Sequence, residues 1–238
     1  MFLKLTKLDN YINELKFAIS EVITMIKAVI FDFWGTLADN GIRSPLRQTY
    51  KMLGLYRYEF PEFVQRLEKV FMTKKFETLD EAFREICRTF NINCRADLLD
   101  RWIGMWNKNW MLAKLYGDSL EGLQRLKDKG LKIGLISNTD NFSIEKVLDK
   151  FELKKLFDAV VLSFDCGFVK NDSEMFDLIC EKLNVNKDEV LMVGDSPETD
   201  IKGAENAGIK AVLIDRQDRR AIENKIINLS DIENYLNK

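Results

Sequence analysis

Four short segments of the chain carry side chains suited to chemistry on a charged group. They are FDFWGTL (31–37), ISN (136–138), GFVKND (167–172) and VGDSPETD (193–200). Asp32, Ser137 and Asp195 each stand at the end of an apolar run that predicts a buried strand. Ligands of an open parallel sheet bind beyond the carboxyl ends of its strands. We therefore expect these side chains to meet in one crevice, together with Lys170.

The residue types at these strand ends predict phosphoryl transfer. Two carboxylates in one crevice, Asp32 and Asp195, are costly unless positive charge lies between them. Lys170 supplies one positive charge. A Mg²⁺ ion would balance the remaining negative charge, because Mg²⁺ prefers one or two carboxylates, water and a substrate phosphate as ligands. The Ser137 hydroxyl and the N–H groups at the start of the next helix would hold an anion. A carboxylate able to attack completes such a site.

Composition excludes several other classes of protein. The 238 residues contain no histidine, which removes the Ser-His-Asp triad and histidine-rich zinc sites. A formal net charge of −2 gives no strong basic field for nucleic acid. The four cysteines form no Cys-x-x-Cys pair, so we expect reduced thiols in a cytoplasmic protein. No apolar run approaches the ~20 residues that cross a bilayer, so no membrane partner is expected.

Five apolar runs predict the strands that position the site. They lie at 27–33, 131–137, 158–163, 189–195 and 210–216, and each is nearly continuous in Val, Ile, Leu and Ala. Such runs are typical of strands that are covered on both faces. A helical pattern precedes each of the last four runs, at 118–130, 141–153, 173–184 and 196–208. This alternation predicts an α/β fold with a Rossmann-like, doubly wound parallel sheet.

The stretch between the first two strands is too long for a single crossover. It carries helical patterns at 62–74, 78–91 and 96–112 and no clear strand. We therefore expect an inserted, all-helical cap at 40–112, a catalytic core at 25–39 and 113–238, and a helical extension at 1–24. Trp102, Trp106 and Trp110 share one face of the last cap helix. Such a stripe either packs in a core, which is the commoner use, or lines a substrate pocket.

The four segments resemble, in order, the four motifs of the haloacid dehalogenase-like (HAD) hydrolase superfamily. The resemblance covers residues 26 to about 216, and it implies a Rossmann-like core with a helical cap. It also implies that Asp32 is a nucleophile that forms an aspartyl-phosphate, and that Lys170 neutralises the reacting groups. Contacts to the phosphoryl group are implied for Thr36, Ser137, Asn138 and Lys170. The implied Mg²⁺ ligands are Asp32, the backbone carbonyl of Trp34, Asp195 and Asp200.

Trp34 departs from the pattern of the superfamily's phosphatases. They carry an aspartate at this place, which protonates the leaving oxygen and then activates water, and an indole does neither. The superfamily's dehalogenases have an aromatic residue here, but they lack the metal-binding aspartate of the fourth motif, which this chain keeps as Asp195. An acidic residue beside Asp32 without a cation is unfavourable. This argument favours a phosphatase over a dehalogenase.

We therefore expect a Mg²⁺-dependent phosphatase that acts on a small phosphorylated metabolite. A metal-free 2-haloacid dehalogenase that uses Asp32, and a non-catalytic protein that binds a phosphorylated ligand, stay open as alternatives. Asp39 and Glu77 are candidates for the missing acid. The expected partner is the small substrate, with no nucleic acid and no membrane, and the chain is a monomer or a homodimer. The arginines at 216, 219 and 220 are expected on a solvated face.

Overall fold

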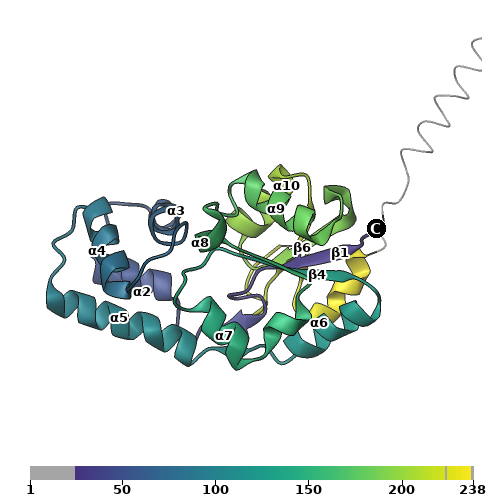
Figure 1. Ribbon diagram of the computed structural model, residues 1–238, viewed down its shortest axis with the longest axis horizontal. Coiled ribbons are helices and arrows are strands. Elements are labelled where there is room, and N and C mark those ends of the chain that lie inside the picture. Colours follow the sequence, from purple (N-terminus) through teal and green to yellow (C-terminus); the bar gives the residue numbers. More distant parts are fainter. Residues whose placement is uncertain (1–24, 223, 237–238) are drawn as a thin grey trace, which may run out of the picture.

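The computed structural model of the chain describes residues 25–222 and 224–236. The helical extension expected at 1–24 lies outside these residues. Within them, no helix has both the length and the apolar composition needed to cross a bilayer. The described chain has two parts, an α/β core and a group of helices beside it (Figure 1).

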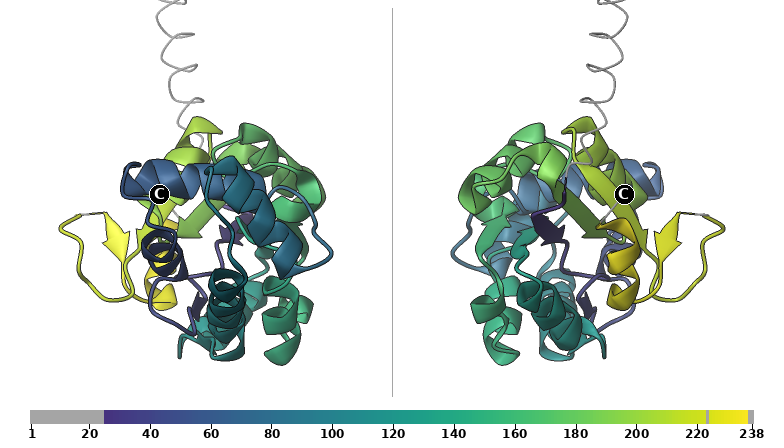
Figure 2. Two further views of the ribbon diagram at one scale, coloured as in Figure 1. Left: turned by 90° about the vertical axis from the view of Figure 1, so that its left-hand side faces the viewer. Right: turned by 90° about the vertical axis from the view of Figure 1, so that its right-hand side faces the viewer.

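A six-stranded parallel sheet forms the centre of the core. Its strands, in spatial order, are β5 (Ala159–Leu162), β4 (Lys132–Ser137), β1 (Ala28–Phe31), β6 (Val190–Gly194), β7 (Lys210–Ile214) and β8 (Lys225–Ile226). The five longer strands lie in the five predicted runs. All four residues of β1 are buried, as expected for a central strand covered on both faces. The two-residue β8, too short to leave a pattern, was not predicted, and it lies at the outer edge of the sheet (Figure 2).

Helices cover both faces of this sheet, which confirms the doubly wound α/β fold. One face packs against α6 (Ser119–Asp128), α7 (Ile144–Lys150) and a C-terminal 3₁₀ helix (Leu229–Tyr235). The other face packs against α9 (Ser173–Leu183) and α10 (Lys202–Asn206). The two groups lie on opposite sides of the strands (Figure 1). A one-turn α8 (Ser163–Cys166) follows β5, and a π-helical turn (Pro197–Ile201) precedes α10.

Four helices inserted after β1 form the cap. They are α2 (Pro45–Met52), α3 (Phe60–Phe71), α4 (Leu79–Thr89) and α5 (Ala96–Met111). The last three correspond to the predicted patterns, whereas the short α2 was not singled out. The cap has its own aromatic core, in which Trp102 stacks on Phe83 with ring centroids 3.9 Å apart. Trp102 and Trp106 are buried there, and Trp106 also lines the cavity described below, so the tryptophan stripe both packs the cap and contributes to a pocket.

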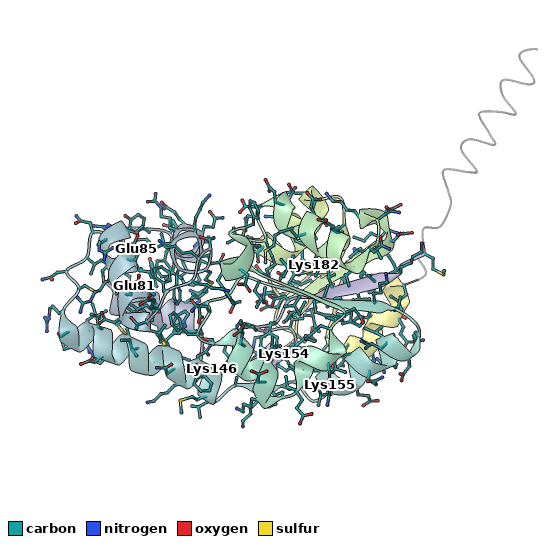
Figure 3. The ribbon with its side chains drawn as sticks, in the orientation of Figure 1. Glu81, Glu85, Lys146, Lys154, Lys155 and Lys182 are labelled. Carbon is teal, nitrogen blue, oxygen red and sulfur yellow. The ribbon has the colours of Figure 1, made fainter. Side chains whose placement is uncertain are left out.

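The two crossings between core and cap run side by side. β2 (Ala38–Asp39) leads into the cap and β3 (Lys114–Leu115) leads out, and they pair antiparallel. Neither strand was predicted, and the domain boundaries at 39/40 and 112/113 stay predictions. Further along, the Lys146 ammonium of α7 lies 4.6 Å from the ring centroid of Trp110 on α5 (Figure 3). The cap is therefore held to the core by side-chain contacts as well as by its two connections.

Candidate active site

A cavity of about 580 Å³ lies between the cap and the carboxyl ends of the core strands. The loops of the core contribute Asp32, Asn138, Lys170 and Asp195 to its wall, and α3 of the cap contributes Glu68. Open α/β sheets bind their ligands at this edge, and cavities of this volume hold small molecules. The cap therefore turns the sheet edge into a covered site for a small ligand.

Three carboxylates and one ammonium meet on the core side of this cavity. Lys170 Nζ donates to Asp32 Oδ1 and to Asp200 Oδ1, at 2.5 Å in each case, and all three side chains are buried. The second oxygen of Asp200 accepts from the backbone N–H of Ser196 at 2.9 Å. Carboxylate oxygens of Asp32, Asp195 and Asp200 lie within 4.8 Å of one another. The acidic residues that follow β1 and β6 are thus brought together around Lys170.

Two glycines allow the carboxylates to approach so closely. A Cβ on Gly194 would lie 2.3 Å from the carboxyl carbon of Asp200, and a Cβ on Gly35 would lie 2.4 Å from Asp195 Oδ2. Gly35 also has a φ of +84°, which L side chains rarely adopt. The loop turns tightly here, because the N–H groups of residues 36–38 all donate to the Phe33 carbonyl. Any side chain at either glycine would displace a carboxylate of the cluster.

Burial and like charge shift the protonation of this cluster. Burial raises the pKa of Asp32 to about 6, although Lys170 opposes the shift, so the carboxyl group stays mostly ionised at neutral pH. Burial, Asp32 and Asp200 together raise the pKa of Asp195 to about 8. Burial also opposes the charge on Lys170, but Asp200 and Asp32 outweigh it and hold the pKa of the ammonium above its ordinary range. The cluster therefore has more negative charge than Lys170 alone balances.

The donor set fits a hard divalent cation. Two oxygens on opposite sides of a Mg²⁺ ion lie about 4 Å apart, which is close to the spacing of these carboxylate oxygens. Asp32 and Asp200 already pair with Lys170, whereas Asp195 has no ion pair among the described residues. These three aspartates are the residues that would hold the ion. Ligation by the backbone carbonyl of Trp34 stays a prediction, although Trp34 is one of the residues that line the cavity.

The two hydroxyl groups expected to contact a phosphoryl group are buried beside the site. Thr36 Oγ1 and Ser137 Oγ have no hydrogen-bond partner among the described residues, and neither residue lines the cavity wall. A buried hydroxyl without a partner is unfavourable, so each of these groups has an unused hydrogen-bond donor beside the site. Asn138, the third expected contact, does line the cavity, and its Oδ1 accepts from the Lys170 backbone N–H at 2.9 Å. These roles in binding a phosphoryl group stay predictions.

The expectation that Arg216 lies on a solvated face is wrong. Its side chain is only 6% exposed, and its guanidinium donates to both carboxylate oxygens of Asp118 at 2.8 Å. It also donates twice to the Thr36 carbonyl, at 2.7 and 3.0 Å, and so fixes the loop that follows β1. Arg220 lines the cavity and donates to the backbone carbonyl of Asp195. Arg216 and Arg220 follow β7, whose carboxyl end lies at the same sheet edge as the other site residues. This position in the sequence could have indicated that they belong to the site.

A carboxylate of the cap also reaches the cavity, and it is neither of the two candidates taken from the sequence. Asp39 and Glu77 are exposed and do not line the cavity. Glu68 lines it from α3, is 9% exposed, and accepts from Asn138 Nδ2 at 3.1 Å. Burial raises the pKa of Glu68 to about 7, with Lys170 opposing the shift. Sequence reasoning missed this residue, which sits within the apolar pattern of its helix.

Known proteins that resemble this chain include both dehalogenases and phosphatases. The (S)-2-haloacid dehalogenase 4A of Burkholderia cepacia is 26% identical over 205 residues, which cover 82% of this chain and 86% of that protein. The glyceraldehyde 3-phosphate phosphatase of Methanothermobacter thermautotrophicus is 26% identical over 197 residues, which cover 81% of this chain and 87% of that protein. Equal identity to the two kinds of enzyme leaves the activity of this chain open.

The fold and the family are less ambiguous than the activity. The crystal structure of a dehalogenase with an intermediate complex matches with a TM-score of 0.63 at 23% identity, covering 91% of this chain and 100% of that one. At this identity the likeness shows the fold alone. Residues 26–208 match the family of haloacid dehalogenase-like hydrolases, a span that includes all four segments of the site. This chain therefore belongs to the haloacid dehalogenase-like hydrolases.

Proposed function

We propose that the chain is a Mg²⁺-dependent phosphatase that hydrolyses a small phosphorylated substrate through an aspartyl-phosphate on Asp32. One observation carries this proposal: the oxygens of three aspartates lie within 4.8 Å of one another, with one lysine among them. Buried like charges at this separation need a cation. A reaction in which Asp32 acted without a metal would give no reason to gather Asp195 and Asp200 beside it.

The side chains of the site divide the work of phosphoryl transfer. Lys170 holds Asp32 Oδ1, which leaves Oδ2 as the oxygen that attacks phosphorus. The hydroxyls of Thr36 and Ser137, which have no partner among the described residues, would donate to the phosphoryl oxygens. A bound Mg²⁺ would supply further positive charge for the phosphoryl group. The cap covers the cavity and so limits the substrate to a small molecule.

The test is the release of inorganic phosphate from a panel of phosphate esters, with Mg²⁺ and with EDTA. We expect turnover in Mg²⁺, loss of turnover in EDTA, and a loss of at least about 10⁴-fold in the D32N variant, because the nucleophile is removed. The D39N variant is the matched control, since Asp39 is exposed and does not line the cavity. Turnover that survives in D32N, or that is unaffected by EDTA, contradicts the proposal.

A 2-haloacid dehalogenase is the second candidate, and Trp34 is the observation that favours it. Trp34 is one of the residues that line the cavity, two positions after the proposed nucleophile, and an indole cannot donate a proton to an alkoxide as an acid does. A departing halide needs no proton, so an aromatic side chain would not hinder that reaction. Release of halide from a 2-haloacid without added Mg²⁺, and no release of phosphate from any ester, would select this function.

A further inference from the structure

Two steps of ester hydrolysis require a group that gives and takes a proton. The leaving alkoxide needs a proton as the phosphorus–oxygen bond breaks, and water needs a base when it attacks the aspartyl-phosphate. Trp34 offers neither an acid nor a base. Another side chain of the cavity must perform both tasks, or the reaction loses an assistance of ~10²–10⁴-fold.

The aspartates and the other glutamate on the cavity wall are poorly suited to this task. Both oxygens of Asp200 are engaged, by Lys170 and by a backbone N–H. Asp140 is engaged at both oxygens as well: Trp106 Nε1 donates to one at 3.0 Å, and the turn that begins α7 donates to the other. Glu198 is exposed, and it pairs with Lys202 at 3.8 Å. The other aspartates belong to the cluster that would hold the nucleophile and the ion.

Glu68 has the free oxygen that these groups lack. Its Oε2 accepts from Asn138 Nδ2, and no described residue provides a partner for its Oε1. The carboxyl group is buried, yet it lines the same cavity as Asp32. Asn138 links it to the core, because the other atom of this amide, Oδ1, accepts from the Lys170 backbone. The cap therefore contributes one carboxyl group to the cavity that the nucleophile also lines.

We propose that Glu68 is the general acid and base of this site, in place of the residue that Trp34 does not supply. This rests on the phosphatase function proposed above. In the first step, Asp32 Oδ2 bonds to phosphorus, the bond to the leaving oxygen breaks, and the Glu68 proton passes to that oxygen. In the second step, ionised Glu68 takes a proton from water, the water oxygen bonds to phosphorus, and the bond to Asp32 breaks. Phosphate leaves, and both carboxyl groups return to their starting states.

The charge around Glu68 suits a group that must exist in both forms. Burial raises its pKa to about 7; Lys170 and the Asn138 amide lower it, and Asp200 and Asp32 raise it. An acid–base catalyst works best when its pKa lies near the working pH. The other charged side chains on the cavity wall are Arg47, Asp140, Asp195, Glu198 and Arg220. A substrate dianion would push the pKa of Glu68 higher still and keep the proton in place for the first step.

The test compares E68Q with the matched variant E62Q, which changes an exposed glutamate of the same helix. Glutamine keeps an oxygen for Asn138 but transfers no proton. With ethyl phosphate, E68Q should lose at least 10²-fold in kcat, because the alkoxide leaves unprotonated. With 4-nitrophenyl phosphate, whose leaving group needs no proton, E68Q should release one equivalent of nitrophenol at nearly the wild-type rate. Turnover should then stall with phosphate bound to Asp32, since the base is missing. E62Q should resemble the wild type with both esters.

E68D keeps the proposal falsifiable if E68Q is poorly folded, and W34D tests rescue where E68Q folds. E68D retains an acid and should lose less activity on ethyl phosphate than E68Q, without a burst. The W34D change, placed in the E68Q background, should restore turnover of ethyl phosphate by supplying a carboxyl group from the loop after β1. An equal loss on both esters, without a burst and without rescue by W34D, would overturn the role of Glu68 and leave the phosphatase intact. If the wild type and E62Q release no phosphate from either ester, the phosphatase function fails, and the role of Glu68 falls with it.

Discussion

The core and the cap each bury carboxylates against the same cavity, but they surround them differently. In the core, Asp32 and Asp200 share the ammonium of Lys170 at 2.5 Å. In the cap, Glu68 meets one amide of the core, and the apolar core of the cap lies behind its helix. In the core, a directly paired ammonium therefore opposes the effect of burial on the pKa of Asp32, whereas in the cap Glu68 has only an amide partner and burial favours its neutral form.

This difference separates two uses of one functional group. A carboxylate that is paired with a buried cation serves as a nucleophile or a metal ligand, since it must stay ionised. A carboxyl group in an apolar surrounding with a free oxygen serves as an acid, since it holds its proton near neutral pH. Removing the charge of Lys170 should therefore destabilise the core, whereas removing the charge of Glu68 should stabilise the protein at high pH. Each of the following predictions tests that contrast.

The largest effect is expected from K170M, which removes the cation of the core cluster. Because buried acids would be left without a partner, the free energy of unfolding should fall by about 3–5 kcal/mol at pH 7. Urea unfolding followed by circular dichroism would measure it. K182M, which removes an exposed lysine of α9 (Figure 3), is the control and should change stability little. A loss below 1 kcal/mol for K170M would mean that pairing does not stabilise the core acids.

In the cap, E68Q should stabilise the protein at high pH. The pKa of Glu68 is raised from 4.5 to about 7 in the folded state, so its contribution is fully present below pH 4.5 and is lost as pH rises through 7. E68Q should therefore be more stable than the wild type at pH 8 by up to about 3 kcal/mol, relative to their difference at pH 4.5. Urea unfolding at both pH values measures this difference. The E62Q control should show none, and a pH-independent difference in E68Q would refute the burial argument.

Mg²⁺ should stabilise the core without help from the cap. At a concentration of about 100 times its Kd, a ligand that binds only the folded state adds about 2.7 kcal/mol. We expect Mg²⁺ to raise the Tm of the wild type and of E68Q alike, and to have no such effect on D195N. Differential scanning calorimetry with Mg²⁺ and with EDTA would measure it. An equal Mg²⁺ shift in D195N would place the ion elsewhere.

A smaller effect is expected where the cap docks on residues 138–142, the docking loop after β4. Asn141 accepts from the Phe76 N–H at 3.1 Å and donates to the Phe76 carbonyl at 3.0 Å. N141A removes both hydrogen bonds, and we expect it to lower the free energy of unfolding by about 1–2 kcal/mol. It should also raise KM more than it lowers kcat on 4-nitrophenyl phosphate, because the cap closes less often. An unchanged KM would show that these hydrogen bonds do not hold the cap in place.

The sheet edge was predictable because its geometry follows from chain direction alone. Parallel strands place their carboxyl ends together, so Asp32, Lys170 and Asp195 could be assigned to one crevice from the apolar runs that precede them. Arg216 could have been added by the same reasoning, since it follows β7. It was placed on the surface because a charged cluster near a chain end is usually solvated. The partly buried pair with Asp118 that overrides this rule joins residues far apart in sequence.

Glu68 was not predictable in the same way. The pattern at 62–74 indicated a helix, and Glu68 follows Val64 by four residues, a spacing that places both on one face. An acidic residue within the apolar face of a helix was the one feature of the sequence that could have indicated a buried carboxyl group. Its meaning depended on which face of α3 meets the core, and that is set by how the cap docks rather than by any spacing along the chain. Asp39 and Glu77 were named only as examples of nearby carboxylates, without positional evidence, and both are exposed.

The paired crossings β2 and β3 join the cap to the core only a few residues beyond the nucleophile, where a pivot of the cap would lie. A swing about this pivot would carry Glu68 away from Asp32 while the nucleophile and its lysine stay where they are. A molecule too large for the lid to shut over it could therefore still meet the attacking oxygen, yet it would receive no proton. The closing of the cap would then select substrates by size and also decide whether they react. A bulky alkyl ester would not be hydrolysed even if it reached Asp32.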